Sequence, residues 1–284
     1  MMNRKDSKVS SRTLKAAEDN GYFARTARSI YALIFLLPFI VLYEILVLKI
    51  NPQLLSSPSS HVRGGVVAFV WIQNFLQYIG LDGKSSWLFA PLVIIITLII
   101  LQATSRKPWK IVWVDFVAMT AECVTIALPL IVLAMVLNRP SQQGRQLAAL
   151  FSTMASKLGS HSFSLDIITG IGAGIYEELI FRLVLICIFM FFFETVLGVK
   201  KTNSILFSVL ISAVLFSLHH HYVFIHGHFA RSEIFALAPF MFRTIAGVYF
   251  AIIFVVRGYG VVAGTHIFYD VIATILNILL FKQY

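Results

Sequence analysis

Apolar segments of roughly the length needed to cross a bilayer recur along the chain, and they limit its fold more than any other feature. A spanning helix needs about 20 mostly apolar residues. The candidate segments are Ile30–Ile50, Gly64–Ile79, Trp87–Ala103, Val112–Leu137, Leu165–Leu197, Ser204–Val223, Ile234–Val256 and Val261–Phe281. The sequence therefore predicts an all-α fold, a polytopic membrane helix bundle with seven or eight spanning helices.

Composition supports this class and argues against two others. Hydrophobic residues make up 58% of the chain and charged residues 13%, whereas a soluble domain carries about 25% charge. A transmembrane β-barrel is not expected, because its strands alternate in polarity over about ten residues instead of staying apolar for twenty. The segment Gly64–Ile79 is shorter and more amphipathic than the rest, so it is expected to lie along the interface or to span imperfectly.

The net charge of +10 is interpreted as a membrane signal and not as a nucleic-acid signal. Basic residues are concentrated in the first 28 residues and between apolar segments, where they set orientation and attract anionic headgroups. The expected partners are membrane lipids and a membrane-associated protein or peptide substrate, with no nucleic acid. The basic tail and the lack of an evident targeting segment favour a multi-pass protein of a bacterial plasma membrane.

The chain divides into two parts. Residues 1–28 are expected to form a polar, basic N-terminal tail, and residues 29–284 an integral membrane domain whose motifs lie within 165–281. The longest polar connection, Asn138–Ser162, is expected to be a loop or a short interfacial helix.

Three ionisable residues, Glu177, Glu178 and Arg182, interrupt the apolar run Ile167–Phe193. Each costs roughly 2.5–3.5 kcal/mol at the centre of a spanning helix, so such groups persist when they pair, face water or carry out chemistry. In an α-helix Glu178 and Arg182 share a face at i, i+4 and can form an ion pair, whereas Glu177 points elsewhere. The alternative interpretation is a structural charge network between helices.

Histidines on the following spans extend this pattern. Phe216 and His220 occupy one helical face, and adjacent histidines point about 100° apart, so His219, His220 and His221 cannot all serve one site from a regular helix. His266 and Asp270 stand at i, i+4, where a carboxylate fixes the tautomer of the imidazole. Four other ionisable residues in apolar segments are interpreted as structural: Glu44, Asp115, Glu122 and Arg243.

Taken together, Glu-Glu-x-x-x-Arg, Phe-x-x-x-His and His-x-x-x-Asp on successive helices resemble the CAAX-processing and bacteriocin-processing (CPBP, or Abi) protease family. The resemblance covers about residues 165–281 and implies an intramembrane endopeptidase of glutamate type. Glu177 with His220 would then activate the attacking water, and Glu178 with Arg182 would organise the site. His266 and Asp270 would support the oxyanion, although this family often has Asn at the last position, and Asp270 can instead orient His266.

The resemblance leaves the cofactor and two rival functions open. The family is often labelled a metalloprotease family, but the chain has no His-Glu-x-x-His helix, so no metal is expected. Glu177, His220 and His266 are the residues that would bind zinc if it were used. The rival functions are a non-catalytic membrane binding or immunity protein of the same fold and a proton-coupled transporter.

Overall fold

The computed structural model of the protein describes residues 21–50, 66–137, 161–225, 228–231 and 235–281. Long helices dominate these residues, and seven segments are long and apolar enough to cross a membrane. The single-helix crossings are α3 (Ser29–Ile50), α5 (Gly83–Thr104), α6 (Val114–Leu137), α10 (Lys201–His221), α11 (Leu237–Arg257) and α12 (Tyr259–Phe281). The predicted membrane helix bundle is confirmed, and the protein is an integral, multi-pass membrane protein.

The remaining crossing is a composite segment that carries the Glu-Glu-x-x-x-Arg motif. It starts with α8 (His161–Gly172) and continues through the wide turns η3 (Ala173–Glu177) and η4 (Leu179–Val184), then α9 (Leu185–Met190) and η5 (Phe191–Val196). The run Leu165–Val196 is 32 residues long, so it exceeds the roughly 20 residues of one crossing. Of the predicted polar connection, residues 138–160 lie outside the described residues.

The described helix α4 (Val67–Tyr78) is too short to cross a bilayer by itself. Its twelve residues extend about 18 Å at 1.5 Å per residue, well short of a hydrocarbon core about 30 Å thick. Four of its side chains are buried in the protein: Ala68, Phe69, Ile72 and Leu76. Residues 66–79 therefore pack on the bundle as a helix shorter than one crossing, whereas residues 64 and 65 of the predicted segment lie outside the described residues.

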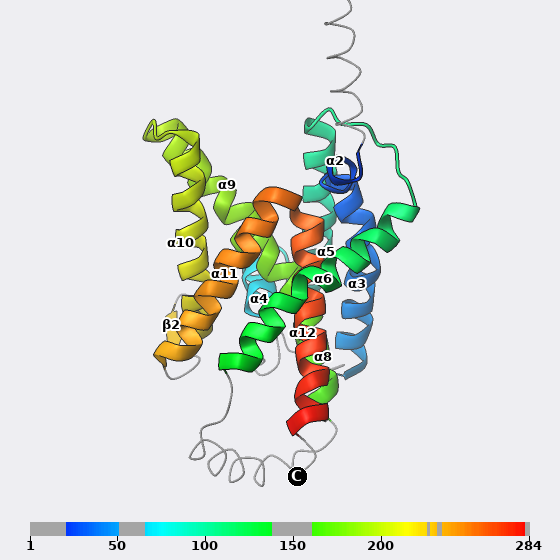
Figure 1. The fold of residues 1–284 in the computed structure, drawn as a ribbon, viewed down its shortest axis with the longest axis vertical. Coiled ribbons are helices and arrows are strands. Elements are labelled where there is room, and N and C mark those ends of the chain that lie inside the picture. Colours follow the sequence, from blue (N-terminus) through cyan, green and yellow to red (C-terminus); the bar gives the residue numbers. More distant parts are fainter. Residues whose placement is uncertain (1–20, 51–65, 138–160, 226–227, 232–234, 282–284) are drawn as a thin grey trace, which may run out of the picture.

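A short antiparallel hairpin, which the sequence did not indicate, follows α10. Its strands β1 (Tyr222–Ile225) and β2 (His228–Arg231) pair Tyr222 with Arg231 and Ile225 with His228. Aromatic and β-branched residues favour this conformation once the helix has ended. In Figure 1 the hairpin lies at the lower end of the bundle, whereas α2 and the turn from η5 into α10 lie at the upper end.

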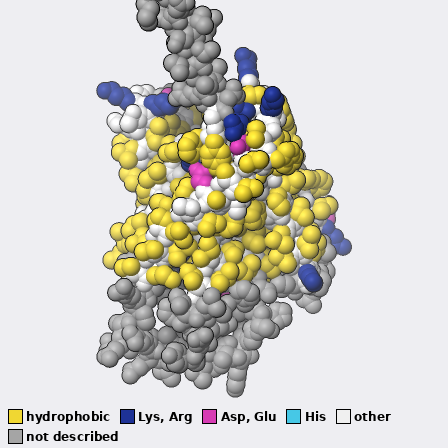
Figure 2. Space-filling view, turned by 45° about the vertical axis from the view of Figure 1, so that its right-hand side comes forward, with side chains coloured by type: hydrophobic (Ala, Val, Ile, Leu, Met, Phe, Trp, Pro, Cys, Tyr) yellow, Lys and Arg dark blue, Asp and Glu magenta, His cyan; other side chains and the backbone are white. Residues whose placement is uncertain are grey.

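The outer surface matches a bilayer environment. Figure 2 shows mostly apolar side chains over the middle of the described surface and several Lys and Arg side chains at its upper end. Exposed basic residues include Arg106, Lys107, Lys200 and Lys201. Such flanking charges suit the headgroup region, where they can contact anionic lipids.

Near the basic end, a short helix joins the bundle through ionic contacts. The predicted tail falls mainly on residues 1–20, outside the described residues, but Tyr22–Thr26 form helix α2. Arg25 of α2 pairs with Asp115 of α6 at 2.7 Å, and this hydrogen bond raises the pKa of Arg25. Arg257 donates to Glu122 at 2.5 and 2.8 Å and to the Thr26 hydroxyl at 2.8 Å. The structural interpretation of Asp115 and Glu122 is thus confirmed.

Helix α12 lies in the core and packs against α3, α6, α8 and α11. Two glycines allow the motif-bearing segment to approach it closely. A Cβ atom on Gly170 would lie 2.6 Å from the Asp270 Cβ, and one on Gly174 would lie 2.7 Å from the Ile267 backbone nitrogen. Real Cβ atoms do not come this close, so these positions set the distance between the two helices.

Replacing Gly174 with valine is expected to push α12 away from the motif segment and to destabilise the protein by about 1–3 kcal/mol, as overpacking does. The measurement is thermal unfolding of the purified protein in detergent. Ala121→Val on the exposed face of α6 is the control, and it should leave the melting temperature nearly unchanged. Equal melting temperatures for the two variants would contradict this account of the close contact.

Candidate functional site

The motif segment differs from the regular α-helix that the sequence suggested. Residues 173–177 and 179–184 wind as π-helical turns on either side of Glu178. Wide turns of this kind recur at functional sites, where side chains are held in positions that a regular helix would not give. Glu177 is 6% exposed, and Glu178 and Arg182 are fully buried. The prediction of a regular helix was wrong, but the buried placement of the charges is confirmed.

Glu178 is the centre of one buried network, which we call the Glu178 network (Glu178, Arg182, His266 and Asp270). Its Oε2 lies 3.2 Å from the Arg182 Nε, so the predicted i, i+4 ion pair is present. Its other oxygen, Oε1, lies 2.8 Å from the Nδ1 of His266 on α12. Glu178 therefore links two helices by contacts from both of its carboxylate oxygens.

His266 is held from three directions within this network. Its Nδ1 faces Glu178, and its Nε2 lies 3.4 Å from the Asp270 Oδ2. The ring also stacks on Phe250 of α11, with centroids 4.5 Å apart and an interplanar angle of 17°. Because both ring nitrogens face carboxylates, this geometry favours the role of Asp270 as an orienting partner over a direct contact with an oxyanion.

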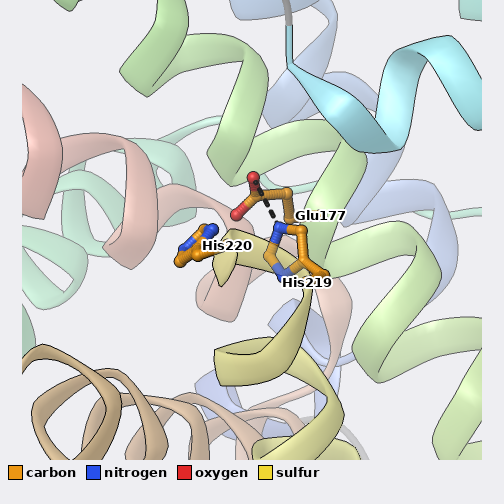
Figure 3. A group of neighbouring side chains, drawn as sticks. All are labelled: Glu177, His219 and His220. Carbon is orange, nitrogen blue, oxygen red and sulfur yellow. Dashed lines mark hydrogen bonds and ion pairs between the residues drawn. The ribbon is translucent and has the colours of Figure 1, made fainter. Parts of the chain in front are cut away.

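Glu177 belongs to a second group, the acid–histidine cluster (Glu177, His219 and His220). The Glu177 Oε1 lies 3.4 Å from the His219 Nε2. Figure 3 shows both imidazoles at the end of α10 turned toward the Glu177 carboxylate. One ligand atom of each of the three residues lies within 4.8 Å of the others. The structure thus brings together the predicted pair Glu177 and His220, and it adds His219.

His219 was missed because only the Phe216-x-x-x-His220 spacing was used. The i, i+3 neighbour of Phe216 also shares its helical face, and that neighbour is His219, whose Nδ1 contacts the Phe216 carbonyl oxygen. His221 turns away from the cluster, toward the rings of Phe235 at 5.2 Å and Phe240 at 6.2 Å. As expected, the three histidines do not all face one site.

Aromatic side chains surround both groups and exclude water from much of the site. The Arg182 guanidinium lies 4.4 Å from the centroid of the Phe216 ring. Phe181 and Trp71 lie 4.7 and 6.0 Å from the His219 ring. Trp71 belongs to α4, so this short helix helps to cover the cluster. A low local dielectric strengthens the charge interactions in such a site.

The carboxyl-terminal half of α3 also contacts the motif segment. Tyr176, directly before Glu177, donates a hydrogen bond from its hydroxyl to the Glu44 carboxylate at 2.9 Å. Its ring packs against Phe69 of α4 at 4.8 Å and Tyr43 of α3 at 5.5 Å. These contacts fix the backbone from which Glu177 projects, and they confirm the structural interpretation of Glu44.

The donor set of the acid–histidine cluster also fits a metal ion. One carboxylate and two imidazoles form a ligand set that catalytic zinc sites use, and the separations between the ligand atoms are within 4.8 Å. His266, by contrast, is held by Glu178 and Asp270. If zinc were used, the ligands would be Glu177, His219 and His220, so His219 takes the place expected for His266.

Comparison with known proteins gives an independent view of the same region. Residues 159–272 match the family model described as type II CAAX prenyl endopeptidase Rce1-like. The match includes all three motifs and every residue of the two groups described above. No curated protein and no solved structure matched the chain.

Proposed function

Since residues 159–272 match the family model described as type II CAAX prenyl endopeptidase Rce1-like, we propose that the protein is an intramembrane endopeptidase of this family. It hydrolyses a peptide bond in a membrane-associated protein or peptide. The observation that carries the proposal is the buried Glu177 carboxylate facing two histidines inside the segment that the family match covers. The proposed location is a bacterial plasma membrane.

In the proposed reaction Glu177 takes a proton from a water molecule held between its carboxylate and the imidazoles of His219 and His220. The water oxygen bonds to the carbonyl carbon of the substrate, and the C–N bond of the resulting tetrahedral intermediate then breaks as the proton passes from Glu177 to the leaving amine nitrogen. General acid–base catalysis of this kind supplies about 10²–10⁴ in rate. We thus propose a glutamate-type mechanism for this protease.

Glu178, the second carboxylate of the motif, takes no direct part in this proposed reaction. Glu178 is bound to Arg182 and His266, so it positions helices and does not accept the proton. We propose that His266 of α12 holds Glu178 in position beside the cluster, while Asp270 holds the His266 ring in place.

We further propose that the reaction does not use a metal. A metal at the acid–histidine cluster would take Glu177 as a ligand, and zinc there would supply a Lewis acid and an acidified water. The other two carboxylates of these groups would not be available as a base, because Glu178 is held by Arg182 and His266, and Asp270 is held by His266. Direct activation of the water by Glu177 requires no movement of Glu177, His219 or His220 from their positions in the structure.

The metal-independent mechanism predicts that chelation will not change activity. Purified protein would be dialysed against 1,10-phenanthroline and assayed on a farnesylated peptide ending in Cys-aliphatic-aliphatic-X, with zinc measured by mass spectrometry. The expected result is substoichiometric zinc and an unchanged cleavage rate, while a soluble zinc protease treated in parallel loses its activity. Stoichiometric zinc that is removed together with activity, and restored together with it, would overturn the proposal.

A further inference from the structure

Two hydroxyl side chains from neighbouring spans bind the backbone of the motif segment at its wide turns, and the proposed reaction uses neither. Tyr259, at the start of α12, donates to the Ile175 carbonyl oxygen at 2.7 Å. Ser212 of α10 donates to the Phe181 carbonyl oxygen at 2.6 Å. Ser212 is fully buried and Tyr259 is 5% exposed, so both bonds are shielded from competing water.

The two carbonyl groups lie on either side of the carboxylates of the motif. Ile175 belongs to η3 and Phe181 to η4, and Glu177 and Glu178 stand between them in the chain. The Ile175 carbonyl oxygen also accepts the backbone N–H of Glu178. A carbonyl oxygen has two lone pairs, so the Tyr259 hydroxyl binds the same oxygen that holds the Glu178 backbone.

Each of these hydroxyls lies seven residues before a histidine of the site. Ser212 precedes His219 on α10, and Tyr259 precedes His266 on α12. Residues seven apart share one face of an α-helix and lie about 10 Å apart along its axis. Both helices therefore turn a hydroxyl and an imidazole toward the motif segment from a single face.

On α10 this arrangement holds the helix at two levels. Ser212 binds the Phe181 carbonyl oxygen, and His219 lies 3.4 Å from the Glu177 carboxylate. One contact alone would leave the helix free to rotate or to slide about it, whereas two contacts on the same face fix its register. The hydroxyl of Ser212 thus helps to determine where the His219 ring meets Glu177.

On α12 the same arrangement serves the other carboxylate. Tyr259 binds the Ile175 carbonyl oxygen, and the His266 Nδ1 lies 2.8 Å from the Glu178 Oε1. Wide turns are rare within helices. A regular α-turn in the same place would rotate the carbonyl groups beyond it, so a hydroxyl bonded to one of these groups favours the wide turn.

We propose that Ser212 and Tyr259 are positioning residues, an inference that rests on the proposed function. Their hydroxyls set the register of α10 and α12 against the motif segment, so that the imidazoles meet the two carboxylates. A misplacement of about 1 Å between reacting groups can lower a rate about 10²-fold. Loss of either hydroxyl therefore lowers kcat and leaves KM nearly unchanged, because both hydroxyls are bonded inside the protein and contact no substrate.

The test compares variants that each lose a single oxygen atom. Tyr259→Phe and Ser212→Ala are expected to lower kcat for the farnesylated Cys-aliphatic-aliphatic-X peptide by about 10–100-fold, with KM changed by less than about twofold. The rates are referred to folded protein, measured by size-exclusion chromatography. A purely structural role would reduce the amount of folded protein and leave kcat unchanged.

The chain offers a matched control for each variant. The Tyr249 hydroxyl of α11 donates to the Ile126 carbonyl oxygen of α6 at 2.6 Å, which is a bond of the same kind between two other spans. Tyr249→Phe should therefore lower the melting temperature, as Tyr259→Phe does, but leave kcat unchanged. Ser208 is as buried as Ser212 and donates to its own helix at 2.7 Å, so Ser208→Ala should also leave kcat unchanged.

A second measurement does not depend on cleavage. Hydrogen exchange of the backbone amides in residues 173–184 is followed by mass spectrometry in phosphatidylcholine nanodiscs. Loss of one hydrogen bond that holds these turns should speed their exchange about fivefold in Tyr259→Phe and in Ser212→Ala. The two control variants should exchange at the original rate in these residues.

Unchanged exchange in residues 173–184, or an equal loss of kcat in the control variants, would contradict the positioning role. The two measurements together separate this inference from the proposed function. If exchange responds as expected but the unaltered protein cuts no peptide, the role in setting the register stands and the protease function falls. If the unaltered protein cuts the peptide and both hydroxyl variants cut it equally fast, the protease function stands and the positioning role falls.

Discussion

Replacing Glu177 with glutamine is expected to reduce peptide cleavage by a factor of about 10²–10⁴ or more, because the base that takes the proton from water is lost. Glutamine has nearly the same shape and keeps one oxygen near His219, so the fold should survive. The measurement is the rate of product formation from a farnesylated Cys-aliphatic-aliphatic-X peptide, followed by mass spectrometry, with melting temperatures recorded in parallel.

The matched control for this experiment is Glu194→Gln. Glu194 lies further along the same segment, in η5, and is exposed, so its replacement should leave the cleavage rate unchanged. Near-normal cleavage by Glu177→Gln would refute the assignment of Glu177 as the base.

A binding or immunity protein of this fold would hold the peptide and cut it in neither form. A transporter would accumulate a substrate in vesicles in response to a proton gradient.

Replacing Glu178 with alanine is expected to damage the fold more than it damages the chemistry. Arg182 is completely buried, and none of the described residues offers a hydrogen-bond acceptor to its two terminal nitrogens. Removing its ionic partner leaves a buried charge without compensation, which costs roughly 3–5 kcal/mol. The expected result is a large fall in melting temperature and in the yield of folded protein.

A double replacement tests whether the unpaired charge is the cause. Glu178→Leu combined with Arg182→Met removes both charges and should recover much of the stability lost in Glu178→Ala, because apolar pairs often replace buried ion pairs without loss. Catalytic activity should not return with it, since His266 loses its contact with Glu178. A double variant as unstable as Glu178→Ala would show that packing, and not the charge, causes the loss.

The architecture of this protein could be predicted well from its sequence, because the bilayer imposes a simple length rule. Seven apolar segments long enough to cross were found where they were expected. The segment 64–79 was expected to lie along the interface or to span imperfectly, and residues 67–78 of it form a helix too short to be among the seven. The strands 222–225 and 228–231 were not predicted, because the predicted span ended at Val223 and the residues after it were expected to form a loop.

The site was predicted in part, and the limit is geometric. Local spacing identified the Glu178–Arg182 and His266–Asp270 pairs, because i, i+4 neighbours meet within one helix. Contacts between helices cannot be read from spacing. The bond from His266 to Glu178 and the approach of His219 to Glu177 depend on how α10 and α12 pack against the motif segment. The catalytic roles of these residues stay predictions until the variants are measured.

The two wide turns around Glu178 make this segment sensitive to its length as well as to its composition. Deleting one residue between 173 and 181 would leave an equally apolar, equally spanning helix. It would nevertheless rotate everything beyond the deletion by about 100°. Arg182 would then turn away from the Phe216 ring of α10 that its guanidinium now contacts. In related chains, a one-residue deletion in the turns around Glu178 would therefore indicate an inactive enzyme even where each charged residue is retained.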